Sequence, residues 1–426
     1  MSYSASMKYE TLSLSFTPAL LERFLRYVKQ WTTSDSSRAD QGFTPSTDRQ
    51  WDFAKNLAEE LKQLGVTDVT VTDHCYVCAR IPATAGMEQV PAVGFLAHMD
   101  TTEEVSGKDV QPQVIENYDG KAINLKESVV LDPELDPKLK TALGDTIITT
   151  DGTTLLGADD KAGIAIIMTA LSQILRDNTP HGTIEIIFSP DEETGHGMDF
   201  VPVEWITAKQ CYTFDGSSLG EIEDECFNAW KSEIVFTGKS KHPGTARPDM
   251  VNAITMASDF VSFLPKHEAP ETTDKYLGFF CPTEISGHME EAKVQLILRD
   301  FDRDEMERRK QTVDTIAAAL MAKYKGSKVT VTHTMQYLNM KEKVQQHPHI
   351  TENLVKAVEM AGVTPVFTPI RGGTDGSRLT EMGIPCPNIF TGGHNYHSRV
   401  EWASLSEMAY GVQTMLNLVA LQADKE

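Results

Sequence analysis

The sequence predicts an α/β fold: a discontinuous larger domain with a mixed sheet flanked by helices, interrupted by a smaller inserted α+β domain. Three observations predict this fold. The 426 residues exceed what one compact core usually holds, so two domains are expected. Short β-rich segments alternate with amphipathic helical segments, as in sheets that carry helices on their faces. From about Phe227 the pattern changes, and from about residue 338 the first pattern resumes.

The first part of the larger domain is predicted to span residues 1–226. Apolar residues at helical spacing predict helices over 18–28, 49–64 and 161–175, and the last of these follows Gly157-Ala-Asp-Asp160, whose acidic residues suit a helix N-terminus. We expect 108–141, with its Asp-Pro turns, to form a long loop or hairpin excursion. Predicted strands are 69–71, 77–81, 92–97, 183–188 and 210–214.

The inserted domain is predicted over residues 227–337. Alternating segments predict strands at 232–237 and 292–299, and apolar residues at helical spacing predict helices at 252–264 and 306–324. Residues 338–426 are predicted to complete the larger domain, with a helix over 348–361 and a strand at 387–390.

Composition excludes several classes of protein. With 39 basic and 61 acidic residues the formal charge is −22, which disfavours binding to nucleic acid or to anionic membranes. No apolar stretch is long enough to cross a bilayer, and the first ten residues lack the basic start and apolar run of a secretory signal. Six cysteines in so long a chain are typical of a reduced protein. The predicted location is cytoplasmic.

Polar side chains follow four of the predicted strands. Because ligands in open α/β sheets collect at the carboxyl ends of the strands, these side chains are expected to converge. They are His98 and Asp100 after 92–97, Glu192 and Glu193 after 183–188, Asp215 after 210–214, and His394 and His397 after 387–390.

Histidine and carboxylate without thiolate are typical of catalytic zinc, since structural zinc sites usually close with cysteine. Asp100 lies two residues from His98 on an extended segment, so it can hold one ring nitrogen while the other binds metal. Adjacent Glu192 and Glu193 must diverge, so that one can ligate and the other act as a base. The residues alone leave two choices open: Asp159 and Asp160 could ligate metal or only cap a helix, and either His394 or His397 could be the ligand.

Two further motifs are interpreted as coincidental. Gly216-Ser-Ser218-Leu-Gly220 fits a nucleophile elbow, but the acidic, alternating segment after it is not a helix start. Cys75 and Cys78 have the spacing of a metal or redox pair, but on a strand they would face opposite sides.

Seven motifs in order resemble the tripeptide aminopeptidase (peptidase T) branch of the dinuclear-zinc aminopeptidase/carboxypeptidase family. The resemblance extends from about Leu21 to the C-terminal helix, and so many ordered motifs are highly specific. The motifs are Leu96–Thr101, Leu156–Gly163, Ser189–Gly195, Phe214–Gly216, His242–Ala246, Ile370–Gly376 and Asn395–His397.

The resemblance implies a centre of two zinc ions per chain, for which Co²⁺ or Mn²⁺ can substitute. It implies that His98 and Asp215 bind one ion, that Glu193 and His397 bind the other, and that Asp159 bridges them. It also implies a small peptide substrate, an inserted domain that acts as a lid, and a homodimer formed through that lid.

The resemblance further implies removal of the N-terminal residue from short peptides, chiefly tripeptides. Glu192 is the expected general base, Asp100 the residue that orients His98, and His242 the donor that stabilises the oxyanion. Two alternatives stay open: an amidase, deacylase or dipeptidase acting on N-acyl amino acids or dipeptides, and a metal-binding protein without catalysis. The expected anchors for substrate are His242, Arg299, Asn339 and Arg371.

Overall fold

The computed structural model describes residues 14–424, which form two compact units. The first unit contains the described residues up to Asp224, Glu342–Thr368, and the described chain from Thr374 onward, and the second contains Glu225–Lys341 and Pro369–Gly373. The sequence placed these boundaries at 226/227 and 337/338. It did not predict that 369–373 joins the second unit. The physical reason is local bonding, because the Ile370 amide donates to the carbonyl of Glu225 at 2.9 Å.

The main sheet of the first unit is mixed and has eight strands, in the order β1-β2-β8-β3-β9-β16-β10-β15. The predicted α/β fold class with an inserted α+β domain is confirmed. The strands are β1 (Asp68–Val71), β2 (Val77–Ile81), β3 (Val93–His98), β8 (Ile184–Ser189), β9 (Cys211–Gly216), β10 (Glu221–Glu223), β15 (Val366–Phe367) and β16 (Asn388–Phe390).

Strands β8, β3, β9 and β16 are neighbours at the centre of this sheet and run parallel to one another. Their carboxyl ends therefore lie at one edge of the sheet, where the four polar segments begin. In β8 and β3 every residue is buried, which explains their nearly continuous apolar sequence.

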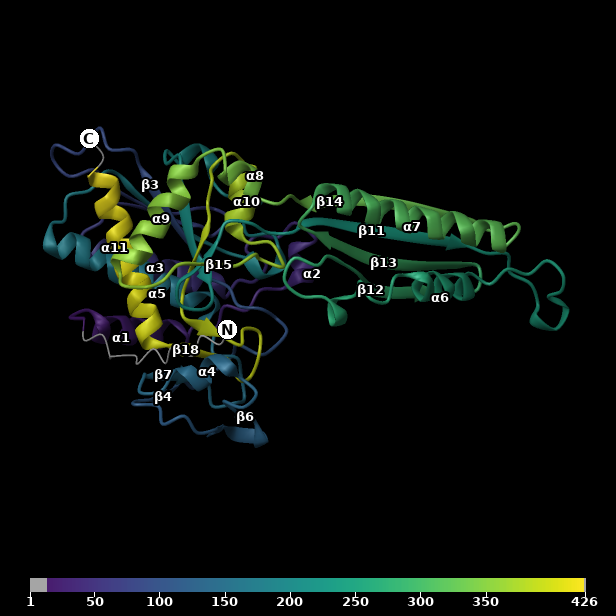
Figure 1. The fold of residues 1–426 in the computed structure, drawn as a ribbon, viewed down its shortest axis with the longest axis horizontal. Helices are drawn as coiled ribbons and strands as arrows, with labels where there is room; N and C mark the ends of the chain where they lie inside the picture. The colour runs from purple at the N-terminus through teal and green to yellow at the C-terminus, as the bar shows by residue number, and fades with distance from the viewer. Residues whose placement is uncertain (1–13, 425–426) are drawn as a thin grey trace, which may run out of the picture. The chain divides into compact units, whose positions relative to one another are not determined.

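Helices cover this sheet, and α5 is the central one. It packs against α1, α11, β3 and β9, and its apolar side chains join the largest core of the molecule (Figure 1). A Cβ at Gly163 would collide with the carbonyl oxygen of Phe214, so the glycine allows α5 to approach the strand that leads to Asp215. The helices of 11 residues or more outside the second unit are α1 (Thr17–Tyr27), α3 (Gln50–Gln63), α5 (Ala158–Asp177), α9 (Pro348–Met360) and α11 (Leu405–Ala423).

A smaller core lies on the other face of the sheet, where side chains of the same strands point the opposite way. Phe95 belongs to the larger core and its neighbour Leu96 to the smaller one, beside Leu379. Shorter helices are α2 (Ser36–Ala39), α4 (Pro137–Thr141), α8 (Lys341–Val344) and α10 (Asp375–Glu381), and 3₁₀ turns are Lys126–Ser128, Glu192–Thr194, Val203–Trp205, Pro243–Thr245 and Pro270–Thr272.

A second, four-stranded antiparallel sheet supports the histidine-bearing loop. Its order is β17-β18-β7-β4, and Trp402 of β18 is buried in a separate apolar cluster. Part of the predicted excursion 108–141 thus joins this sheet, because β4 pairs with β7, and β7 pairs with β18 of the C-terminal region. The strands are β4 (Gln113–Ile115), β7 (Ile147–Thr149), β17 (Gly393–His394) and β18 (Trp402–Ser404), and a separate pair is β5 (Ile123–Asn124) with β6 (Val130–Leu131).

The second unit has one four-stranded antiparallel sheet, in the order β12-β13-β11-β14, with helices α6 and α7 packed on it (Figure 1). Alternate residues of β13 are buried in its own core with Phe260 and Val313. Its elements are β11 (Asn228–Thr237), α6 (Ala253–Phe263), β12 (Phe279–Gly287), β13 (Glu291–Asp300), α7 (Arg303–Lys323) and β14 (Lys328–Tyr337).

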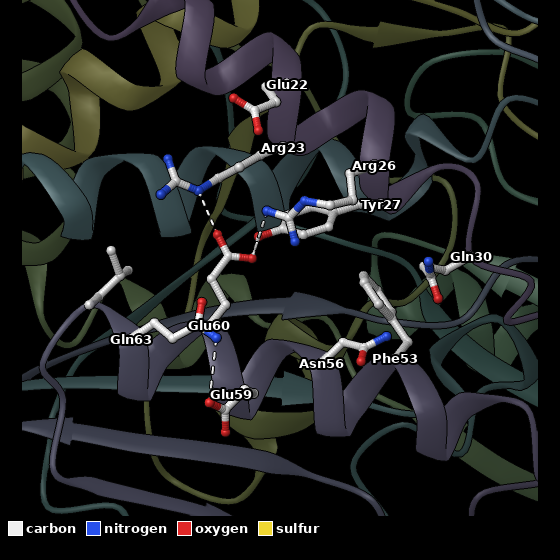
Figure 2. Close-up of a pocket in the computed structure, with 11 residues that line it drawn as sticks. Glu22, Arg23, Arg26, Tyr27, Gln30, Phe53, Asn56, Glu59, Glu60 and Gln63 are labelled. Carbon is white, nitrogen blue, oxygen red and sulfur yellow. Dashed lines mark hydrogen bonds and ion pairs between the residues drawn. The ribbon is translucent and has the colours of Figure 1, made fainter.

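In the described part of the chain, none of the helices combines the length and the apolar character needed to cross a membrane. A hollow between α1 and α3 is lined by charged side chains, and Figure 2 shows that Arg23 and Arg26 both point toward Glu60. Their nitrogens lie 2.8 and 2.9 Å from the Glu60 carboxylate, which also accepts the Tyr27 hydroxyl. These charges satisfy one another, so the hollow offers no converging set of metal ligands.

Candidate metal centre

His98 is the last residue of β3, and its ring is buried with 2% of the residue exposed. Its Nδ1 lies 3.4 Å from Oδ1 of Asp100, whose backbone oxygen is 3.2 Å from the same nitrogen. The other ring nitrogen, Nε2, faces the carboxylates of Asp159 at 2.8 Å and Asp215 at 3.6 Å. The geometry places Asp100 on the far side of the ring from the acidic cluster, as expected for a residue that orients a metal-binding histidine.

Asp159 lies at the start of α5, immediately after a turn in which Gly157 has a φ of 82°, a value that favours glycine. One carboxylate oxygen faces His98, and the other lies 3.4 Å from Nε2 of His397. Asp160 instead accepts the backbone amides of His98 and Gly163, at 3.1 Å each. Asp159 therefore faces both histidines, whereas Asp160 holds the backbone of its own surroundings.

Glu192 and Glu193 form a 3₁₀ turn after β8, and their backbone amides donate to the two oxygens of Asp100, at 3.0 and 3.2 Å. Glu193 is held on both sides, because Oε1 accepts the Thr102 amide at 3.1 Å and Oε2 lies 2.8 Å from Nε2 of His397. Among the described residues, the Glu192 carboxylate has no hydrogen-bond partner, and its closest ion contact is with His98 at 4.0 Å. The two side chains diverge, and only that of Glu193 is fixed.

The two histidines of the Gly-rich loop lie in different surroundings. His394 is buried, stacks on Trp402 with ring centroids 4.0 Å apart, and has Nε2 3.1 Å from the Glu407 carboxylate. His397 is 34% exposed and lies against Glu193 and Asp159. Its Nδ1 is 3.3 Å from Glu104, an exposed residue that the sequence did not single out because no pattern distinguishes it from the acidic residues around it. The structure brings His397, and not His394, to the acidic cluster.

Charges in this cluster are strongly coupled. Burial alone would lower the pKa of His98, but hydrogen bonds with Asp100, Asp159 and Asp215 raise it well above its usual value. Burial also opposes the shift at Asp159, yet hydrogen bonds with His397 and His98 hold its pKa below the usual range. Burial raises the pKa of Glu193 to about 8, and the nearby charge of Asp159 adds to this effect. The cluster thus stabilises positive charge strongly.

Burial shifts the pKa of Glu192 in the same direction as that of Glu193, and the difference between the two carboxylates is that only Glu193 is held by partners. Burial raises the pKa of Glu192 well above the usual value; His98 lowers it, and Asp215 and Asp375 raise it. A carboxylate with a raised pKa and no hydrogen-bond partner among the described residues binds a proton more readily than a solvated one, which suits a general base.

The residues present fit a divalent metal centre. Two groups of three residues could each hold a metal ion, because the ligand atoms within each group all lie within 4.8 Å of one another. One group is His98, Asp159 and Glu193, and the other is His98, Glu192 and Asp215. Among the described residues, no lysine or arginine forms an ion pair with these carboxylates. Several buried carboxylates with no lysine or arginine to balance their charge are costly unless a cation binds them. Nitrogen and oxygen donors without thiolate suit zinc or a similar ion.

We predict that His397→Gln and His394→Gln have different effects. His397→Gln should lower the metal content of the protein and lower turnover by more than about 100-fold, because changing even residues behind a metal ligand costs about 10-fold to 100-fold. His394→Gln should lower stability by about 1–3 kcal/mol through its buried pair with Glu407, and keep the wild-type metal content. Metal analysis, turnover and thermal melting of both variants measure these effects. Loss of metal from the His394 variant alone would reverse the assignment.

The four predicted substrate anchors all lie in the second unit. His242 is exposed, and its Nδ1 accepts the Gly244 amide at 3.1 Å. Arg371 donates to the carbonyls of Lys275 and Leu277 at 2.7 Å each. Local partners also hold Arg299, which donates to the carbonyls of Trp230 and Leu298, and Asn339, which bonds the amides of Cys226 and Lys341. Their predicted contact with substrate stays a prediction.

The two motifs interpreted as coincidental gain no support from the structure. Ser218 is buried and followed by β10, so the strand-turn-helix geometry of a nucleophile elbow is absent there. Cys75 and Cys78 are both buried and free.

Comparison with known proteins gives a consistent picture. The family model described as Peptidase family M20/M25/M40 matches residues 151–421. A protein of Clostridium perfringens named peptidase T is 46% identical over 405 residues, which cover 95% of this chain and 99% of the relative. A peptidase T of Geobacillus thermodenitrificans is 46% identical over 409 residues, 95% of this chain and 98% of the relative.

Solved structures share the fold. A tripeptidase from Staphylococcus aureus is 20% identical with a TM-score of 0.76, and an aminopeptidase PepT from Bacillus cereus is 24% identical with a TM-score of 0.73; both alignments cover 96% of this chain and 99% of the other. A Bacillus subtilis protein described as a dinuclear metal binding peptidase is 14% identical with a TM-score of 0.64, over 96% of this chain and 98% of that one.

Proposed function

Because the chain belongs to the M20 peptidase family, and within it to the peptidase T group, we propose that it removes the N-terminal residue from short peptides, chiefly tripeptides. The observation that carries this proposal is the pair of adjacent glutamates. Glu193 is fixed against His397, whereas among the described residues Glu192 has no hydrogen-bond partner beside His98, and this difference supports a division into one metal ligand and one separate base. The names of the relatives support the substrate class.

We propose that the centre holds two zinc ions, with Co²⁺ or Mn²⁺ able to substitute. His98 and Asp215 would hold one ion, Glu193 and His397 the other, and Asp159 both. The positions of the two Asp159 oxygens support this division, because one faces His98 and the other faces His397. When bound, such ions polarise a carbonyl and acidify coordinated water.

The side chains of the first unit then have separate roles. Glu192 takes the proton of the attacking water and passes it to the leaving amine. Asp100 fixes both the His98 ring and the backbone of the Glu192–Glu193 turn, so the base and one ligand are positioned by the same carboxylate. We propose that His242 donates to the carbonyl oxygen of the substrate, as a preorganised donor stabilises developing negative charge.

A free N-terminus should be required. We predict turnover of a free tripeptide at least about 100-fold faster than that of its N-acetylated form, because a site built around a polar group leaves buried groups unpaired when that group is blocked. Chromatography of the released first amino acid, carried out with each substrate, measures the ratio of the two turnover rates. Faster cleavage of the acetylated peptide or of an N-acyl amino acid would favour the alternative amidase or deacylase, and a dipeptide preference would favour a dipeptidase.

Location and assembly stay proposals. No disulfide joins the cysteines in the described part of the chain, which supports the cytoplasmic location proposed from the sequence. We propose a homodimer through the second unit, whose sheet ends in the edge strands β12 and β14. Ile285 and Met335 on these strands are exposed, and an open edge is a surface with which a second strand can pair.

A further inference from the structure

Glu401 lies four residues after His397 and is 1% exposed. Its two carboxylate oxygens accept the backbone amides of four consecutive residues. Oε2 accepts those of Leu156 and Gly157 at 2.7 and 2.8 Å, and Oε1 accepts those of Ala158 and Asp159 at 2.7 and 3.2 Å. One buried side chain thus satisfies the whole turn that leads into α5, which no pattern in the sequence indicated.

This contact joins the two segments that carry opposite parts of the candidate metal centre. The turn ends at Asp159, whose carboxylate faces both histidines, and Glu401 follows the loop that carries His397. The two segments lie more than 240 residues apart in the chain, so no local bonding sets their spacing. The Glu401 carboxylate is the link that holds the Asp159 backbone directly.

The loop of His397 has other anchors, whereas in the described structure the amides of residues 156–159 have the Glu401 carboxylate as their only acceptor. Thr149 donates to the Glu401 carbonyl at 2.8 Å, and Arg399 donates to the carbonyl of Gly152 at 2.6 Å. These contacts keep the backbone of the loop in place without the Glu401 carboxylate. Removing the carboxylate should therefore release the Asp159 turn and leave His397 where it is.

We propose that Glu401 is a positioning residue that fixes the Asp159 carboxylate relative to His397 and so sets the affinity of the centre for divalent metal ions. A purely structural role would instead make Glu401 a cap for the N-terminus of α5. Both roles predict lower stability when it is changed, but only positioning predicts weaker metal binding. The inference rests on the proposed metal centre.

The test is a zinc titration of metal-free full-length protein, by calorimetry, for the wild type, Glu401→Gln and a matched control. Glutamine keeps the size of the side chain but replaces one of the two acceptor oxygens with an NH₂ group, which cannot accept a backbone N–H. The control is Glu185→Gln, because Glu185 is equally buried and its carboxylate accepts the backbone amides of Thr207 and Ala208 and pairs with Arg80, away from the centre. Thermal melting of the metal-free proteins measures the structural part separately.

We expect zinc affinity to fall about 10-fold to 100-fold in Glu401→Gln and to stay within about twofold in Glu185→Gln, with lower melting temperatures in both. Should Glu401→Gln not fold, Glu401→Asp keeps the charge on a shorter side chain and should show a smaller loss of the same kind. Wild-type zinc affinity in a destabilised Glu401 variant would overturn the proposal. A wild-type protein that binds no zinc would overturn the metal centre itself, and hence this inference with it.

Discussion

Glu192→Gln will lower turnover of a tripeptide by about 10²-fold to 10⁴-fold and leave two metal ions bound, because general-base catalysis contributes a factor of this size. Glutamine has the shape of glutamate but cannot accept the proton of the attacking water. Glu192 has no hydrogen-bond partner among the described residues, so the exchange breaks no structural bond. Metal content by elemental analysis and kcat with a free tripeptide are the two measurements.

The neighbouring Glu193→Gln is the matched control. Glu193 lies 2.8 Å from His397 and accepts the Thr102 amide, so its change should lower metal content as well as turnover. Glu192 is also close enough to His98 and Asp215 to be a ligand. If Glu192→Gln lost one ion and the Glu193 variant kept both, the roles of the two glutamates would be the reverse of those proposed.

Asp159→Asn should weaken the binding of both ions and abolish turnover. Its two oxygens face different histidines, and an amide group leaves only one oxygen for two ions. Changes behind a ligand already cost about 10-fold to 100-fold in affinity, so loss of a shared ligand should cost more than about 100-fold for each ion. Stepwise chelation with a competing dye measures both affinities.

Asp160→Asn provides the comparison one residue away. Asp160 accepts two backbone amides, so its variant should lose about 1–3 kcal/mol of stability while retaining two ions when folded. Full metal binding by Asp159→Asn, with loss of metal from Asp160→Asn, would show that the assignment within this pair is wrong.

The sequence predicted the convergence of the site, because it depends on strand ends. Apolar segments that lead into His98, Ser189 and Asp215 could be recognised as buried strands, and parallel neighbours deliver such residues to one edge. Adjacent glutamates must diverge in any extended or turn conformation, which made a division of roles between Glu192 and Glu193 predictable as well.

The choice between Asp159 and Asp160, and between His394 and His397, depended on the family resemblance. Long-range contacts decide which residue of each pair faces the metal centre, and the residues alone do not reveal these contacts. Asp159 and Asp160 have the same side chain, and only the amides of His98 and Gly163 turn Asp160 away. His394 is withdrawn by Trp402 and Glu407, which lie further along the chain.

Contacts between residues far apart in the chain could not be predicted from the sequence either. Glu401 contacts a turn more than 240 residues earlier, and Arg371 joins the second unit through the carbonyls of Lys275 and Leu277. Neither contact follows from periodicity, turn chemistry or motif spacing, which report only on neighbours in the chain.

We propose above all a two-metal centre that activates water for removal of an N-terminal residue. The most direct test is to strip the protein of metal, return zinc in measured steps, and record bound zinc per chain together with turnover of a free tripeptide. We expect no turnover without metal and full turnover at two ions per chain. Tripeptide turnover that persists in the stripped protein, with no zinc bound, would contradict the proposed metal centre.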